Sequence, residues 1–180
     1  MRNSKRTMQT LILLVLACML TACGFQLRGS YSLPFQTLSI ALAPNSALYA
    51  QIKRGVEASS PTRIVDDPKA AEANLVVLSD TQEKVILSLN AAGRAREYDL
   101  VRTFTFKVIA PDNTDYLLPS RITLRRDMTF NDDLVLSKDA EEALLWRDIQ
   151  SDLVQQLLRR LSAIKLVQQT AEDAAHAATP

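Results

Sequence analysis

The sequence predicts an α+β fold, a two-layer sandwich in which two helices pack on one face of a mainly antiparallel sheet of four to five strands. Around residues 96–108, apolar and polar side chains alternate, which is typical of a strand with one buried face. After Ser46, and again after Ser137, apolar residues instead recur every four positions, as in amphipathic helices. Two such helices and one half-buried sheet can cover each other's apolar surfaces.

The N-terminal part of the domain is predicted to contain a strand, a helix and a second, short strand. Residues 37–43 alternate in the manner of a strand, and Ser46 can cap the helix that follows. The helix should bury one stripe, made of Leu48, Ile52 and Val56. Residues 59–61, Ser-Ser-Pro, end this helix, and residues 62–65 can form the short strand.

The middle of the chain is predicted to form the sheet. Residues 74–89 are rich in aliphatic and β-branched side chains, and residues 90–93 form a turn in which Gly93 can take a positive φ. The buried face of the next strand should hold Tyr98, Leu100, Phe104, Phe106 and Val108. Arg102 falls on the same face, and its place there has no explanation in the sequence. After a turn at residues 111–115, residues 116–130 return as a strand.

The longest helix is predicted to begin at Ser137, with Asp139, Glu141 and Glu142 in its first turns, where the helix dipole favours anions. A four-residue apolar repeat should lie on the sheet. We expect the domain to span residues 37–167. Residues 168–180 contain no large apolar side chain, so we expect them to be disordered.

The N-terminus resembles the leader of a bacterial lipoprotein. Three cations precede an apolar run at residues 11–20, which is about half the ~20 residues of a membrane-spanning helix. The Leu-Thr-Ala-Cys sequence that follows resembles a lipobox. This resemblance implies cleavage of a signal peptide, residues 1–22, and diacylglycerol and N-acyl chains on Cys23, with residues 23–36 as the tether. Such chains hold a protein stably on a membrane. The alternative is a plain signal peptide with an incidental cysteine.

The composition argues against several functional classes. The leader holds three of the 21 basic residues and none of the 20 acidic ones, so the mature chain has a formal charge of −2 and no general attraction for nucleic acid. His176, the only histidine, lies in the expected disordered tail, which excludes an ordinary Ser-His triad or histidine metal site. Two carboxylate pairs, residues 66–67 and 132–133, are most simply turn residues. We therefore predict no enzyme, no metal and no cofactor besides the covalent lipids.

Four motifs, in order, are similar to the LptE/RlpB family of lipopolysaccharide (LPS) assembly lipoproteins. They are residues 20–28 (Leu-Thr-Ala-Cys-Gly-Phe-Gln-Leu-Arg), 93–100 (Gly-Arg-Ala-Arg-Glu-Tyr-Asp-Leu), 136–142 (Leu-Ser-Lys-Asp-Ala-Glu-Glu) and 157–161 (Leu-Leu-Arg-Arg-Leu). The resemblance implies an outer-membrane lipoprotein in a one-to-one complex with the β-barrel LptD. In that complex it acts as a plug and assembly factor, and it binds LPS on the way to the outer leaflet. Gly24, in place of an Asp that commonly retains lipoproteins in the inner membrane, agrees with an outer-membrane location.

The same resemblance implies an LPS site. Lys138 matches a lysine that the family uses at the start of its last helix, whereas Ala91 stands where the family uses an arginine in the hairpin. Arg94 and Arg96 can substitute for that arginine, and Arg121, Arg125 and Arg126 can join them if the neighbouring strand pairs. Arginine and lysine suit the phosphates of LPS because they form charge-assisted hydrogen bonds. Two other classes remain open: a stand-alone, periplasm-facing lipoprotein that binds lipid or peptide, and an envelope hydrolase, for which the chain offers no nucleophile and base.

Overall fold

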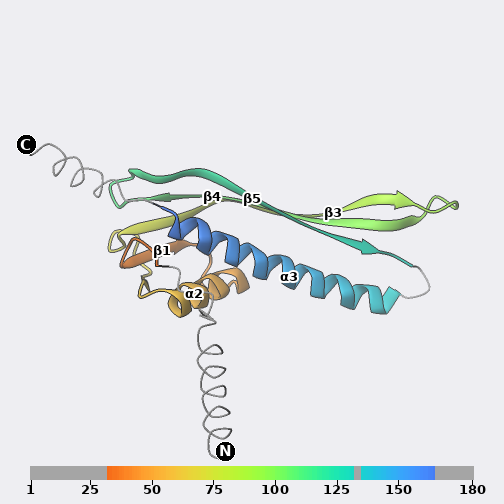
Figure 1. Cartoon of the computed structure of the whole chain (residues 1–180), viewed down its shortest axis with the longest axis horizontal. Helices are drawn as coiled ribbons and strands as arrows, with labels where there is room; N and C mark the ends of the chain where they lie inside the picture. The colour runs from red at the N-terminus through yellow and green to blue at the C-terminus, as the bar shows by residue number, and fades with distance from the viewer. Residues whose placement is uncertain (1–31, 132–134, 165–180) are drawn as a thin grey trace, which may run out of the picture.

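The computed structural model describes residues 32–131 and 135–164, and Cys23, most of the tether and residues 165–180 lie outside this part (Figure 1). The described chain forms five strands and two helices in the order expected from the sequence. These are β1 (Thr37–Ala41), α2 (Ala47–Ser59), β2 (Arg63–Ile64), β3 (Ala73–Leu89), β4 (Ala95–Ile109), β5 (Asp115–Thr129) and α3 (Val135–Ser162).

The five strands form one mixed sheet in the order β2-β1-β3-β4-β5. The long strands β3, β4 and β5 pair antiparallel, whereas β1 is parallel to both of its neighbours. β1 pairs with β3 only between Ala73 and Val76. Beyond that point β3 is the edge strand of the described sheet for the rest of its length.

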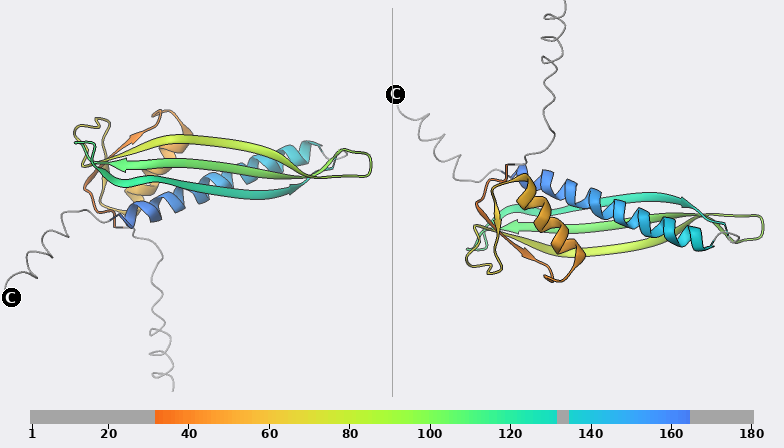
Figure 2. Two further views of the ribbon diagram at one scale, coloured as in Figure 1. Left: turned by 90° about the horizontal axis from the view of Figure 1, so that it is seen from above. Right: turned by 90° about the horizontal axis from the view of Figure 1, so that it is seen from below.

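Both helices lie on the same face of the sheet, as predicted (Figure 2). Their apolar stripes and one face of the strands make a single core, and Phe104, Phe106, Ile52 and Leu157 are fully buried within it. The opposite face of the sheet has no covering layer in the described chain (Figure 1). The predicted two-layer α+β sandwich is therefore confirmed.

Local signals account for helix α2. The hydroxyl of Ser46 accepts a hydrogen bond from the backbone N–H of Tyr49 at 3.1 Å, and the helix ends at Ser59, before the proline. Gly55 marks a close approach to α3, because a Cβ atom at this position would lie 3.0 Å from Cδ1 of Leu158. The small residue therefore allows α2 and α3 to pack closely.

Arg102 is buried in the core face because it forms part of a polar network that joins the two layers. Its Nε and Nη2 atoms donate to the two carboxylate oxygens of Asp80 on β3, at 2.9 and 2.7 Å. Its Nη1 atom donates to Gln150 of α3 at 3.3 Å, and Gln150 in turn donates to Gln51 of α2 at 2.8 Å. This arrangement satisfies a guanidinium that is only 3% exposed.

Two details of the prediction need correction. Helix α3 begins at Val135, two residues before the predicted Ser137, so Ser137 lies within its first turn and does not cap it. The core also begins before the predicted boundary at residue 37, because Leu33 and Phe35 are buried in it. These two side chains of the tether therefore pack against the domain.

Candidate functional site

The sheet extends well beyond α2, and this extension presents the candidate site. At one extremity of the molecule, the β3–β4 hairpin, the end of β5 and the start of α3 lie side by side (Figures 1 and 2). We call this region the hairpin end. It contains Lys138, Arg94 and Arg96, three of the cations that the sequence singled out.

Lys138 lies in the first turns of α3 and faces β5. Its Nζ atom is 2.8 Å from a carboxylate oxygen of Glu141 and 3.1 Å from the hydroxyl of Thr129, and its side chain is 14% exposed. Lys138 therefore fixes the start of α3 to the end of β5. An anionic ligand that binds it must compete with one carboxylate.

A second lysine, Lys84 of β3, lies at the same end, and sequence reasoning missed it. Its Nζ atom is 2.5 Å from the carboxylate of Glu142 and 4.3 Å from the centroid of the Tyr98 ring. Glu142 also accepts a hydrogen bond from Nε1 of Trp146 at 3.3 Å. Glu142 lies 58 positions away along the chain, so no local pattern could have indicated this cation.

Arg94 and Arg96 are both exposed and lie in and just after the hairpin turn. The side-chain oxygen of Asn90 accepts from the backbone N–H of Ala92 and of Arg94, and Gly93 has a φ of 75°, as the turn prediction required. The carbonyl of Arg96 accepts from the N–H of Phe130, next to the Thr129 that contacts Lys138. The structure therefore places these arginines at the same end as Lys138.

The three arginines of β5 do not form one cluster with them, although β5 pairs with β4 as anticipated. Arg121 and Arg125 lie opposite Thr105 and Val101, on the face turned away from the helices. Nη1 of Arg125 donates to Asp99 at 2.6 Å. Arg126 lies on the helix side, where it pairs with Asp152 of α3. Of the three, only Arg126 shares a face with Lys84 and Lys138.

Large apolar side chains are exposed beside the cations of the hairpin end. They are Val85, Ile86, Leu87 and Leu89 of β3, and Val135, Leu136 and Leu144 of α3. Exposed apolar side chains that gather in one region mark binding surfaces more often than scattered ones do. An apolar surface next to several cations suits an anionic amphiphile, whose acyl chains and phosphates need both.

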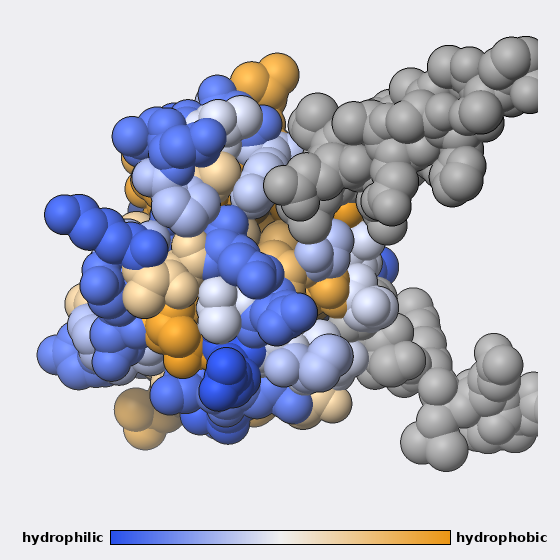
Figure 3. All heavy atoms as spheres, turned by 90° about the vertical axis from the view of Figure 1, so that its left-hand side faces the viewer, coloured by the Kyte–Doolittle hydropathy of each residue, from blue (hydrophilic) through white to orange (hydrophobic). Residues whose placement is uncertain are grey.

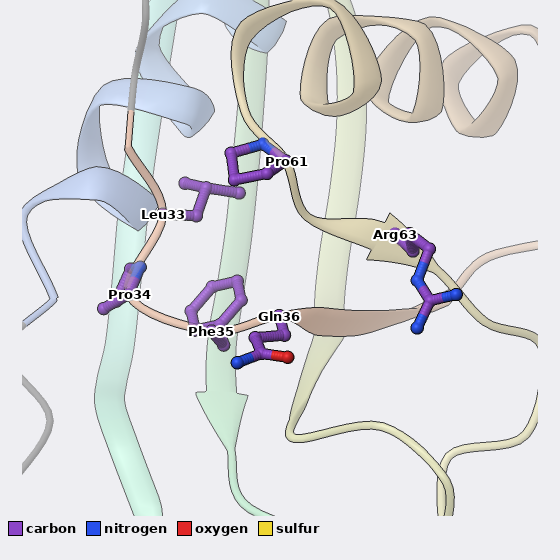
Figure 4. Close-up of a pocket in the computed structure, with 6 residues that line it drawn as sticks. All are labelled: Leu33, Pro34, Phe35, Gln36, Pro61 and Arg63. Carbon is purple, nitrogen blue, oxygen red and sulfur yellow. The ribbon is translucent and has the colours of Figure 1, made fainter.

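The opposite end of the molecule offers a different surface (Figure 3), where hydrophilic side chains dominate around small apolar patches. A pocket of about 400 Å³ lies there, between β2 and the segment that leads into β1 (Figure 4). Leu33, Pro34, Phe35 and Pro61 line it, and Arg63 is its one charged residue. It is shallow and holds no pair of groups suited to acid–base chemistry.

The described residues contain no group of three or more His, Cys, Asp or Glu side chains arranged to hold a metal ion. Asp66 accepts from the hydroxyl of Tyr49 in α2 at 3.4 Å, and Asp67 accepts from the N–H of Lys69 at 2.9 Å within its own turn. The second carboxylate pair, at residues 132–133, and His176 lie outside the described part. Within residues 32–131 and 135–164, no helix has the length and apolarity of a membrane span.

Comparison with known proteins agrees with the fold and with the sequence motifs. The chain is 33% identical to lipoprotein B from Nitrosomonas europaea, with a TM-score of 0.68 over 78% of this chain and 91% of that one. The minor lipoprotein from Acinetobacter baumannii gives a TM-score of 0.60 at 26% identity, covering 73% of this chain and 93% of the other.

Curated protein sequences give further matches. The LPS-assembly lipoprotein LptE of Pectobacterium atrosepticum is 32% identical over 85% of this chain and 84% of its own length. That of Yersinia enterocolitica is 30% identical over 86% of this chain and 75% of its own. The family profile described as "LptE: Lipopolysaccharide-assembly" matches residues 35–161. The chain therefore belongs to the LptE family of LPS-assembly lipoproteins, whose role is not enzymatic.

Proposed function

We propose that this chain is an outer-membrane lipoprotein, anchored through acylated Cys23, that forms a one-to-one complex with the β-barrel LptD. In this proposal it acts as a plug and assembly factor of the barrel and binds LPS during insertion into the outer leaflet. Membership of the LptE family is the observation that carries the proposal. The mixture of positive and negative side chains on the domain also suits the polar lumen of an outer-membrane barrel.

The hairpin end supports the LPS part of the proposal. Lys84, Lys138, Arg94 and Arg96 gather there, and the same end exposes apolar side chains, namely Val85, Ile86, Leu87 and Leu89 of β3 and Leu136 of α3. Phosphates of LPS can replace Glu141 on Lys138 or bind the exposed arginines by charge-assisted hydrogen bonds. The apolar side chains can contact acyl chains.

One variant tests this site. Lys138→Asp should weaken LPS binding by roughly tenfold or more, since like charges juxtaposed at an interface cost several kcal/mol. Lys69→Asp makes the same charge change at an exposed turn residue before β3, at the other end of the sheet, and serves as the control. Binding is measured with purified LPS, and the circular dichroism spectrum and melting temperature confirm folding. Unchanged affinity in folded Lys138→Asp would remove this residue from the site.

Copurification tests the complex and decides between the two functional classes. Tagged full-length protein extracted from membranes should bring down a large β-barrel in equal amount, identified by mass spectrometry. A stand-alone lipoprotein that binds lipid or peptide would bring down none, and that result would refute the proposed partnership.

A further inference from the structure

Two hydrogen-bond donors at the hairpin end converge on a single carboxylate, that of Glu142. The ammonium of Lys84 on β3 donates to its Oε2 atom at 2.5 Å, and the indole Nε1 of Trp146 donates to its Oε1 atom at 3.3 Å. Glu142 and Trp146 lie four residues apart on α3, so their side chains share one side of the helix. An ammonium and an indole N–H can donate but cannot accept hydrogen bonds. The two donors therefore suit an anion, and the chain's own carboxylate is bound between them.

Two aromatic rings hold Lys84 in this position independently of Glu142. The Nζ atom lies 4.3 Å from the centroid of the Tyr98 ring and 5.8 Å from that of Phe130. The rings pack edge to face, with centroids 5.5 Å apart and an interplanar angle of 87°. The face of an aromatic ring attracts a cation. The ammonium can therefore keep its place when the carboxylate leaves, and it stays available to another anion.

Solvent reaches both members of the ion pair, so an incoming ligand can reach them too. The side chain of Lys84 is 33% exposed and that of Glu142 is 23% exposed, whereas Arg102 in the core network is 3% exposed. A partly exposed pair between two long side chains contributes little to stability. Exchange of Glu142 for another anion therefore costs the fold little.

The neighbouring side chains favour an anion that carries an apolar chain. Lys84 and Ile86 lie opposite Leu100 and Tyr98 of β4, so they share the face of the sheet that is turned toward the helices. Ile86 is 54% exposed. A phosphate on Lys84 thus has an exposed apolar side chain beside it. Charge-assisted hydrogen bonds can hold the phosphate of an amphiphile here while its acyl chain contacts Ile86.

We propose that Lys84 and Trp146 form a phosphate site, that Glu142 occupies it in the free chain, and that a phosphate of LPS enters it by displacing Glu142. Because Glu142 competes with the ligand, it lowers the affinity of the site and favours release of the bound lipid. This inference rests on the proposed binding of LPS, and it adds a residue of the chain that opposes that binding.

The test measures the affinity of the full-length chain for purified LPS. Glu142→Gln keeps the shape of the side chain and removes the competing charge, so we expect the affinity to rise about threefold. Glu57→Gln makes the same change in a glutamate that pairs with Lys53 on α2, away from the hairpin end, and should leave the affinity unchanged. The circular dichroism spectrum and the melting temperature of each variant confirm folding.

Two further comparisons show whether Glu142 acts through the proposed site. In the Lys84→Gln background, Glu142→Gln should no longer raise the affinity, because the competition is for Lys84. Trp146→Phe keeps an aromatic ring but removes the N–H donor, and it should weaken binding about threefold. With LPS from which the phosphates have been removed, the gain from Glu142→Gln should disappear. Inorganic phosphate alone should not raise the melting temperature as LPS does.

The sign of the Glu142→Gln effect decides the matter. An unchanged or lower affinity in the folded variant would overturn the inference, because Glu142 would then only fix α3 to β3, while the proposed function stands. A gain that persists in Lys84→Gln or with dephosphorylated LPS would also overturn it, since net charge alone would explain the effect. An equal response to inorganic phosphate would assign the site to a free anion and overturn the lipid. If the wild-type chain binds no LPS, that part of the proposed function fails and the inference fails with it.

Discussion

The ion pair between buried Arg102 and partly exposed Asp80 gives the sharpest test of how this sandwich is held together. Three variants separate its parts: Asp80→Ala, Arg102→Met, and the double variant Asp80→Leu/Arg102→Met. The first leaves a guanidinium in the core, the second leaves a carboxylate, and the third replaces both charges by apolar side chains. Breaking a buried ion pair from one side is costly because the remaining charge stays desolvated, whereas replacing both partners is often neutral.

The magnitudes follow from the exposure of each partner. The Arg102 side chain is 3% exposed, and Asp80→Ala leaves it with the 3.3 Å hydrogen bond to Gln150 alone. We expect Asp80→Ala to lower the free energy of unfolding by about 3–5 kcal/mol. The Asp80 side chain is 27% exposed, so water can reach its carboxylate in Arg102→Met. That variant should lose only about 1–3 kcal/mol. The double variant should lie within about 1 kcal/mol of the wild type.

Urea unfolding followed by far-UV circular dichroism measures all three values, and a common m-value checks that the native states remain comparable. The expected order of stability is wild type and double variant, then Arg102→Met, then Asp80→Ala. If Asp80→Ala proves as stable as Arg102→Met, this refutes the argument that the more deeply buried charge costs more when it is left unpaired. A double variant less stable than either single variant would show that the hydrogen-bond network stabilises the fold by more than the mutual compensation of its two charges.

Two further predictions concern other parts of the fold. Gly55→Val should lower the free energy of unfolding by about 1–3 kcal/mol, because a Cβ atom added at this position would lie only 3.0 Å from Cδ1 of Leu158. Wild-type stability of this variant in urea would contradict the close approach. In the β4–β5 turn, the backbone N–H of Thr114 donates to Asp112 and lowers the pKa of that carboxyl below its ordinary value. The hydrogen bond to ionised Asp112 therefore stabilises the folded protein at pH values above the unfolded-state pKa. This stabilisation is lost as pH falls through the folded-state pKa. Carbon-detected NMR titration should show this shift, and it should vanish in urea-unfolded protein.

Periodicity predicted the layers of this protein because it reports a local property, the direction in which each side chain points. The four-residue repeat of α2 and the alternation of β4 assign Ile52 and Phe104 to the core, and the structure buries both. Alternation in β5 likewise assigns Arg121 and Arg125 to the face opposite Ile122, in agreement with the strand pairing. The Ser46 cap could be predicted for the same reason, since its partner is three residues away.

Contacts between distant segments could not be predicted in this way. Arg102 has partners 22 and 48 positions away, and only the assembled sheet and helix show why it is buried. The same holds for Lys84 and its partner Glu142 at the hairpin end. The parallel pairing of β1 was also out of reach, because a five-residue strand carries too little pattern to fix its direction. The family motifs indicated Lys138, and its ion pair with Glu141 follows from the i, i+3 spacing of a helix, but its contact with Thr129 emerges only from the packing of α3 on β5.

The length of the sheet relates the fold to the proposed function. The 17-residue β3 extends about 56 Å, whereas the 13-residue α2 covers only about 20 Å of it. Beyond α2, the hairpin end packs against α3 alone among the described elements, with Lys84 of β3 paired to Glu142 and Lys138 in contact with Thr129 of β5. Its remaining apolar and charged side chains therefore stay at the surface on both faces. A longer α2 would bury more of them and stabilise the domain, but it would cover the surface that binding requires. The short helix and the long hairpin therefore suit the LPS binding that we propose, since exposed surface is gained where the core ends.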